Sequence, residues 1–402
     1  MLSGEQAFQI SSIDDTLPTR IGYTLSSTFL HDGSGLITGG HQDSTVRLHR
    51  LASTSTSTQA DQYLDEHKSQ VISLSLSRNG QKLLTGDTQG VILLWDLGSA
   101  TVVGTFSILP PQAALSLSFS ADADLVAVCG STEGSVYIWK TSSRTAAPTI
   151  LRNTSFRHLS AVFANGGATV SVHPNTPILL ATVCSDGPAR IYSVRWGTSV
   201  HAMRTIEEEL GGPAKALCWF PGDCGRLLVT FKDTIHIAIL APEHSTSRRQ
   251  TSKRRLATRV LCEGHTKPIT AICLSPCARY IASTARDGPR GHATVRVWNG
   301  VTGEQLLRPL LVRGGVRKLE FSPQGNRLLT IDVNGAVTVW DFGVLEVSAE
   351  VQGAVAQIGE LAKAEEEMTE ALQLLVKDEV RSSYMFLCLT IHAFDSAPGL
   401  FR

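Results

Sequence analysis

The sequence has few of the features that mark an enzyme. Its eight cysteines form no CxxC pair, and neither an HExxH nor a GxSxG motif occurs, so neither a metal centre nor a catalytic nucleophile is indicated. The glycines of residues 32–40 (DGSGLITGG) precede a strand pattern rather than a helix, which favours a hairpin turn over a phosphate-binding loop. We therefore expect a non-catalytic chain with no cofactor and no metal.

Charge and hydropathy limit the functional class of the protein and its expected location. The 36 Lys and Arg residues balance the 36 Asp and Glu residues, which argues against binding of nucleic acid by bulk charge. The longest apolar stretch, residues 384–394, is shorter than the ~20 residues that a membrane helix needs, and no signal-peptide pattern opens the chain. Most cysteines lie in apolar strand-like runs, as in proteins of a reducing compartment. These features predict an intracellular protein of the nucleus or the cytoplasm that does not bind membranes.

An internal repeat organises most of the chain. Four segments end alike, namely VILLWD (Val91–Asp96), VYIWK (136–140), VRVWN (295–299) and VTVWD (Val337–Asp341). Trp95 and Trp139 are 44 residues apart, and Trp298 and Trp340 are 42 apart. A period of about 40–45 residues with a terminal Trp-Asp is typical of four-stranded propeller blades.

Three weaker copies complete the repeat. Segments 45–50, 189–194 and 234–240 carry Leu48, Tyr192 and Ala238 at the tryptophan position. Together the seven copies place third-strand endings near residues 48, 95, 139, 192, 238, 298 and 340. A sandwich could also use alternating strands, but the near-constant period favours an all-β, seven-bladed propeller. Either residues 6–13 or residues 344–351 would supply the strand that closes the ring.

These repeats resemble the WD-repeat family over roughly residues 20–345. In that family a histidine, a hydroxyl of the second strand, a turn aspartate and the tryptophan form a hydrogen-bonded set. The resemblance implies such a set in the sixth blade, made by His265, Ser283, Asp287 and Trp298. It implies a partial set in the second blade, made by His67, Thr85 and Trp95, with Gln89 at the turn.

The tail differs in kind from the repeats, so we divide the chain into a propeller, residues 1–351, and a helical tail, residues 352–402. Residues 352–380 predict an amphipathic helix of about four heptads. Its apolar stripe runs through Ile358, Leu361, Met368, Leu372 and Leu375, with Glu365 as the one flaw. The helix either packs on its own propeller or pairs with a partner as in a coiled coil; we favour the partner.

Two loops are candidate contact surfaces. An insertion between the second and third strands of blade six carries Arg286, Arg290 and His292, and is either a recognition loop or a neutral insertion. A basic loop between the third and fourth strands of blade five contains Arg248, Arg249, Lys253, Arg254 and Arg255. That loop is a solvated connection, a nuclear-import signal or a nucleic-acid patch.

The combined features predict a protein–protein interaction scaffold within a multi-protein complex, of the kind found in ribosome biogenesis or chromatin. The layout of a propeller followed by a short helical tail is similar to that of the propeller subunit of a nuclear pre-ribosome processing complex. The alternative is a nucleic-acid-binding propeller that uses the basic loop 248–255. Expected partners are other proteins, bound through the propeller faces and the C-terminal helix.

Overall fold

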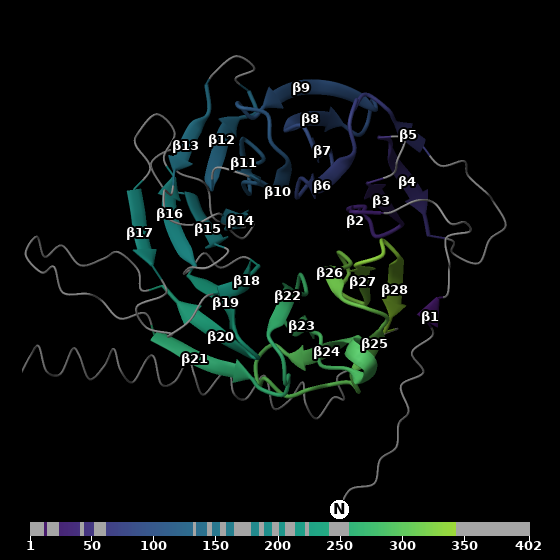
Figure 1. The fold of residues 1–402 in the computed structure, drawn as a ribbon, viewed down its shortest axis with the longest axis vertical. Helices are drawn as coiled ribbons and strands as arrows, with labels where there is room; N and C mark the ends of the chain where they lie inside the picture. Colours follow the sequence, from purple (N-terminus) through teal and green to yellow (C-terminus); the bar gives the residue numbers. More distant parts are fainter. Residues whose placement is uncertain are drawn as a thin grey trace, which may run out of the picture. The chain divides into compact units, whose positions relative to one another are not determined.

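A computed structural model describes residues 12–13, 24–40, 44–51, 62–131, 134–142, 147–152, 158–164, 178–184, 189–194, 201–205, 214–221, 225–240 and 257–342. These residues form seven four-stranded antiparallel sheets arranged around one axis (Figure 1). The chain divides into two compact units, Met1–Gly343 and Val344–Arg402. The described residues all belong to the first unit, so the predicted C-terminal helix and its stripe lie outside them.

Each of the first four blades is made of four consecutive strands. Blade 1 contains β2 (Ser26–Phe29), β3 (Gly35–Gly39), β4 (Val46–Arg50) and β5 (Gln62–Leu64). Blade 2 contains β6 (Val71–Leu76), β7 (Lys82–Asp87), β8 (Val91–Asp96) and β9 (Thr101–Ser107). Blade 3 contains β10 (Ala114–Phe119), β11 (Leu125–Gly130), β12 (Ser135–Lys140) and β13 (Thr149–Arg152). Blade 4 contains β14 (His158–Phe163), β15 (Ile178–Cys184), β16 (Arg190–Val194) and β17 (His201–Thr205).

The last three blades repeat this order, except that blade 7 borrows its fourth strand. Blade 5 contains β18 (Ala214–Trp219), β19 (Arg226–Phe231), β20 (Thr234–Ile239) and β21 (Ala257–Cys262). Blade 6 contains β22 (Ile269–Leu274), β23 (Tyr280–Ala285), the 3₁₀ turn η1 (Pro289–Gly291), β24 (Ala293–Asn299) and β25 (Leu310–Val312). Blade 7 contains β26 (Val316–Phe321), β27 (Arg327–Asp332) and β28 (Val337–Asp341). The seven predicted third strands correspond to β4, β8, β12, β16, β20, β24 and β28.

The chain's N-terminal part closes the ring. β1 (Ser12–Ile13) is the outer strand of blade 7, where Ser12 pairs with Trp340 and Ile13 with Val339. Of the two predicted closing segments, 6–13 and 344–351, the first therefore supplies the strand through its last two residues, and the second lies outside the described part. A ring closed in this way leaves only short, protected strand edges.

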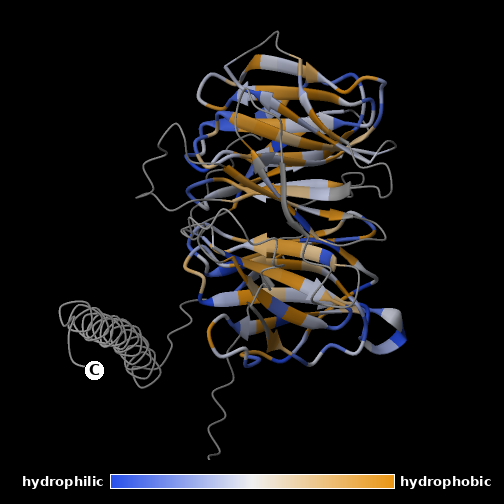
Figure 2. Cartoon of the chain, turned by 90° about the vertical axis from the view of Figure 1, so that its left-hand side faces the viewer, coloured by the Kyte–Doolittle hydropathy of each residue, from blue (hydrophilic) through white to orange (hydrophobic). Residues whose placement is uncertain are grey.

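The hydrophobic core lies between neighbouring sheets. Second strands are largely buried on both sides, as in the fully buried β11 (LVAVCG), because each sheet packs against a neighbour on either face. Trp139 and Tyr137 of blade 3, for example, pack with Phe106 and Leu84 of blade 2. Seen from the side, the strands are mainly apolar and the connecting turns gather on two hydrophilic faces (Figure 2). Binding surfaces must therefore be sought on these two faces and in the central channel.

Candidate functional site

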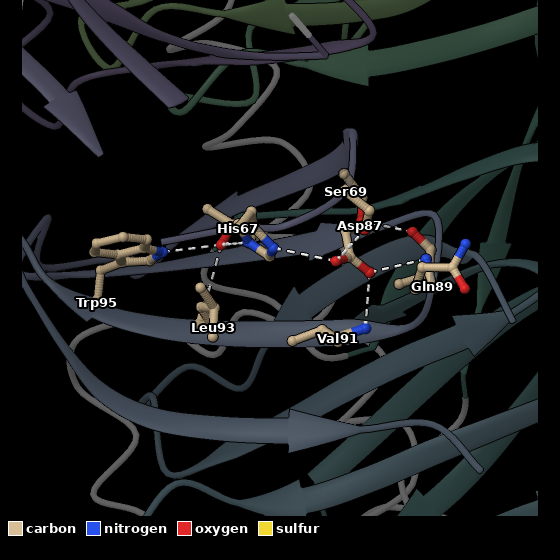
Figure 3. Close-up of polar contacts among 10 residues, drawn as sticks. His67, Ser69, Asp87, Gln89, Val91, Leu93 and Trp95 are labelled. Carbon is tan, nitrogen blue, oxygen red and sulfur yellow. Dashed lines mark hydrogen bonds and ion pairs between the residues drawn. The ribbon is translucent and has the colours of Figure 1, made fainter. Parts of the chain in front are cut away.

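Four polar side chains of blade 2 form a chain of hydrogen bonds inside the blade (Figure 3). The Trp95 indole N–H donates to Thr85 Oγ1 at 2.9 Å, and Thr85 Oγ1 lies 2.6 Å from His67 Nε2. The other ring nitrogen, His67 Nδ1, lies 3.4 Å from Asp87 Oδ2. Because a carboxylate only accepts, Nδ1 carries the proton, and in the neutral ring Nε2 accepts the Thr85 hydroxyl.

Asp87 supplies the carboxylate of this set, which corrects the expectation of a partial set with Gln89 at the turn. Its Oδ1 accepts the backbone N–H groups of Gln89 (2.9 Å) and Val91 (2.8 Å) and so caps the turn into β8. Burial alone would raise the pKa of the Asp87 carboxyl, but hydrogen bonds from His67 and Ser69 outweigh it and leave that pKa below its ordinary value. The aspartate lies two positions earlier in the turn than the family pattern predicts.

Blade 6 holds the same arrangement around its own tryptophan. Trp298 Nε1 donates to Ser283 Oγ at 2.8 Å, His265 Nε2 lies 2.8 Å from that hydroxyl, and His265 Nδ1 lies 2.9 Å from Asp287 Oδ2. Burial lowers the pKa of His265, and the neighbouring Asp287 opposes this shift without cancelling it. The ring is therefore neutral near pH 7, and its two nitrogens serve two different neighbours.

The register of the sheets identifies the residue at the tryptophan position in the remaining blades. In blade 1 it is His49, not Leu48 as predicted, because His49 pairs with Leu36 as Trp95 pairs with Leu83. His49 Nε2 lies 2.9 Å from Thr38 Oγ1, so an imidazole replaces the indole. Tyr192 and Ala238 occupy the position in blades 4 and 5, as predicted, and pair with Leu180 and Leu227. In blade 7, Trp340 Nε1 donates to Thr330 Oγ1 at 3.1 Å.

These sets are buried and serve the fold. The polar atoms of these side chains form hydrogen bonds with one another. Trp95 is only 1% exposed, so no reactant could reach these groups. Among the residues that the structure describes, no group of three or more His, Cys, Asp or Glu side chains could hold a metal ion. No helix in this described part is long and apolar enough to cross a membrane.

The face on which the innermost strands begin, here called the upper face, is built differently from blade to blade. In five blades the pairing of the innermost strand with its neighbour skips one residue directly after the first one. In blade 5 it skips two residues, Lys215 and Ala216. Each of these irregularities is a β-bulge. Blade 1 has a comparable position at Leu25, whose N–H bonds Gly39 O at 2.9 Å beside the Ser26–Gly39 pair. A bulge changes the direction of its side chain, and the bulged residue is not paired with the neighbouring strand. The residue at this position can therefore differ from blade to blade while the rest of the strand pairing is kept.

A central channel of about 770 Å³ connects these positions. All seven innermost strands line it, and Arg317, Leu25, Ile72 and Leu115, at the bulge position of blades 7, 1, 2 and 3, are among its lining residues. Deeper in the channel Glu320 accepts a hydrogen bond from the Thr28 hydroxyl (2.7 Å) and forms an ion pair with Lys318 (2.8 Å). The upper rim of the channel is therefore cationic at blade 7 and apolar at blades 1–3.

The blade 6 insertion lies on the same face, between β23 and β24. Its predicted contact residues do not share one role. Arg286 and Arg290 are exposed, whereas His292 is half-buried and its Nδ1 accepts the Gly314 N–H at 3.1 Å. His292 thus holds the insertion to the loop that leads into blade 7, and only the two arginines are free to meet a partner. In Figure 2 the coiled ribbon of η1 stands out from one face of the ring.

Comparison with known proteins agrees with this geometry. Residues 59–96, 108–140 and 256–299 match the WD domain, G-beta repeat family. The chain is a WD-repeat β-propeller. Its fold resembles that of the β-propeller domain of Cps50 (Swd1) from Myceliophteria thermophila, with a TM-score of 0.61 and 17% identity over 80% of this chain and 97% of that domain.

Curated relatives of this WD-repeat protein match it over shorter stretches. It is 34% identical over 80 residues to the WD repeat, SAM and U-box domain-containing protein 1 of Danio rerio, covering 20% of this chain and 15% of the relative. It is 33% identical over 122 residues to Autophagy-related protein 16 of Arabidopsis thaliana, covering 29% and 22%. The Target of rapamycin complex subunit wat1 of Schizosaccharomyces pombe is 32% identical over 81 residues, covering 20% and 24%. The matches thus span a quarter or less of each relative.

The sequence interpretation overlooked part of the upper face of this propeller. Arg313 and Arg317 flank Gly314 and Gly315, beside the insertion, and neither was singled out. Aligning the segments that begin VIS, ITA and VRK would have exposed the variable second residue as a common surface position. The basic loop Arg248–Arg255 falls between β20 and β21, and like Leu361, Met368, Leu372 and Leu375 it lies outside the described residues.

Proposed function

We propose that this WD-repeat propeller is a non-catalytic scaffold that holds other proteins in a multi-protein complex, using its upper face. The main support for this proposal is the rim of the channel, where structurally equivalent positions are occupied by Leu25, Ile72, Leu115 and Arg317. The ladder does not need a particular side chain at a bulge, so apolar and cationic residues there suit recognition better than folding. A subunit role is in keeping with the relative whose name identifies it as a complex subunit.

Affinity capture followed by size-exclusion chromatography tests this function. The full chain should co-elute with a partner in fixed stoichiometry, and the variant Ile72→Glu with Leu115→Glu should lose that partner. Leu311→Glu is the matched control, because Leu311 lies 51% exposed on the outer strand of blade 6. Loss of the partner in the control but not in the rim variant would contradict the use of the upper face, and melting curves must show that both variants fold.

We propose further that the amphipathic helix predicted for residues 352–380 contributes to assembly, since its predicted stripe at Leu361, Met368, Leu372 and Leu375 would need an apolar surface to cover it. Replacing Leu361 and Leu372 by Asp should remove a partner and leave the melting midpoint of the propeller unchanged. A fall of many degrees in that midpoint, with partners retained, would instead place the helix on its own propeller.

A nucleic-acid-binding function is the second candidate. It rests on the segment STSRRQTSKRR, which carries five basic residues and no acidic one. Five charges on one loop contact few phosphates, so we infer weak binding with a shallow salt dependence and favour nuclear targeting as the role of this loop. Changing all five to Ser should move the protein out of the nucleus. Unchanged localisation with lost RNA or DNA binding would reverse the order of the two functions.

A further inference from the structure

Three arginines lie on the upper face close to Gly315, where blade 6 passes into blade 7. Arg286, Arg313 and Arg317 are exposed. Gly315 shows how close they are, since a Cβ at this residue would lie 2.7 Å from Arg286 Nε and 2.9 Å from its Nη2. The Arg286 guanidinium therefore occupies the space above Gly315. Arg313 and Arg317 are each two residues from Gly315, so their Cα atoms lie within about 7.6 Å of its Cα.

The surrounding backbone holds this cluster in place. The N–H of Gly314 donates to His292 Nδ1 at 3.1 Å, and Gly314 O accepts the Ala293 N–H at 2.6 Å, which joins the insertion to the blade 7 loop. Gly315 O accepts the N–H of Val333 at 2.8 Å, which joins the loop to the next turn. The three arginines thus project from a surface that is fixed at both ends, which reduces the entropy cost of binding.

No acidic side chain of the described residues forms an ion pair with Arg286, Arg313 or Arg317. The described acids nearby are committed elsewhere: Asp287 accepts hydrogen bonds from His265 and the Thr266 N–H, and Asp332 accepts the N–H groups that follow it in its turn. Glu320 is paired with Lys318. A cluster of like charges without internal counter-charge attracts an anion from outside, and guanidinium groups match carboxylates in two-point geometry.

The neighbouring part of the same rim is apolar. Passing from blade 7 to blades 1, 2 and 3, the bulge position carries Leu25, Ile72 and Leu115 after Arg317, and all four line the channel. Leu109, 73% exposed, adds a further apolar side chain in the loop that enters blade 3. A single-stranded nucleic acid would be expected to stack on exposed aromatic side chains along a basic track, whereas the aromatic residues that line the channel, Phe119 and Trp219, are buried.

We propose that the upper face binds an acidic segment of a partner protein that also carries apolar side chains. Arg286, Arg313 and Arg317 hold its carboxylates, while Leu25, Ile72 and Leu115 receive its apolar groups at the mouth of the channel. This inference rests on the proposed scaffold function and specifies the chemistry of the partner. Charge complementarity sets the position of the acidic residues, and apolar burial next to it supplies further affinity.

Fluorescence polarisation with defined probes tests the proposal on the full chain. A fluorescein-labelled peptide of alternating leucine and glutamate should bind, and the same peptide with glutamine in place of glutamate should bind at least about tenfold more weakly, because hydrogen bonds between charged groups are lost. Arg286→Gln with Arg317→Gln should weaken the glutamate peptide by a similar factor. Arg279→Gln is the matched control, since Arg279 is exposed between β22 and β23 at the opposite face, and should bind as the wild type does.

A second variant keeps all three arginines and displaces only the guanidinium of Arg286. Gly315→Ala puts a methyl group where the Arg286 guanidinium lies and should weaken the glutamate peptide, with less effect on the glutamine peptide. Equal affinity for both peptides, or unchanged binding in the double arginine variant, would overturn the proposal. Tighter binding of oligouridine than of the glutamate peptide would overturn it as well. Binding of a phosphoserine peptide without any binding of the glutamate peptide would also overturn it. If no peptide binds but partner capture still depends on Ile72 and Leu115, only the acidic assignment fails and the scaffold function stands.

Discussion

Thr38 Oγ1 and His49 Nε2 lie 2.9 Å apart in blade 1, in the place where blades 2, 6 and 7 pair a hydroxyl with a tryptophan indole. The two side chains are buried. The smaller imidazole keeps the hydrogen bond to the second strand while contributing less apolar surface than an indole.

Replacing His49 by Leu should therefore destabilise the propeller by about 1–3 kcal/mol, because Thr38 loses its ring partner inside the blade. Chemical denaturation measures this loss. Arg50→Ala, at the exposed neighbouring position, should leave the midpoint nearly unchanged. Equal midpoints for His49→Leu and Arg50→Ala would show that this pair contributes nothing to stability.

Stability should fall as the pH falls below about 6.5. Burial lowers the pKa of His265 in the folded state, so between its folded and unfolded pKa values the unfolded chain binds more protons. The stabilisation is complete above the unfolded value and is lost as the pH falls through the folded one. Burial lowers the pKa of His236 too, which adds to the same trend.

Thermal melts at about pH 7.5 and pH 5.5 check this pH dependence. The His265→Gln variant should be less stable at the higher pH but should lose less on acidification than the wild type. An identical loss in both proteins would exclude His265 as a source of the effect.

The thiols should react in an order set by burial. Burial raises the pKa of Cys218 to about 11 and that of Cys262 to about 12, and it raises the pKa of Cys273 as well. Cys277 is exposed at the turn after β22. Alkylation of the native protein followed by peptide mapping should modify Cys277 before Cys218, Cys262 and Cys273, which should react only on unfolding. Early modification of Cys218 would show that the channel wall opens.

Removal of β1 should destabilise blade 7 in particular. Deleting residues 1–13 leaves the edge of β28 unpaired, so the melting midpoint should fall and hydrogen exchange should quicken in Val337–Asp341. Deleting residues 1–8 preserves the Ser12–Trp340 and Ile13–Val339 pairs and serves as the control. If the two truncations behave alike, the strand contributes little to closure.

The sequence predicted the all-β propeller, its seven blades and its third strands, because a strong period of apolar strands and turns repeats along the chain. It misjudged details that depend on register. His49 was missed since Leu48 is the more hydrophobic neighbour, and Asp87 was missed because it lies only two residues after Thr85, whereas the sequence interpretation placed the turn residue of the set at Gln89. Arg317 was missed because the innermost strands were not aligned with one another, and Arg313 was missed because the approach of Arg286 to Gly315 joins segments whose contact no local pattern reveals.

Closure by β1 has a consequence for how the protein is made. Ser12 is synthesised before Trp340, with six other blades between them, so the strand of this ring that is made first must wait for the blade that is made last. Until then the nascent chain carries an unpaired β-edge, the kind of surface that chaperones shield. In the finished ring the two ends of the propeller belong to the same blade. An open array of repeats frays separately at its two termini. In this ring, loosening of residues 12–13 and loosening of β28 both open blade 7.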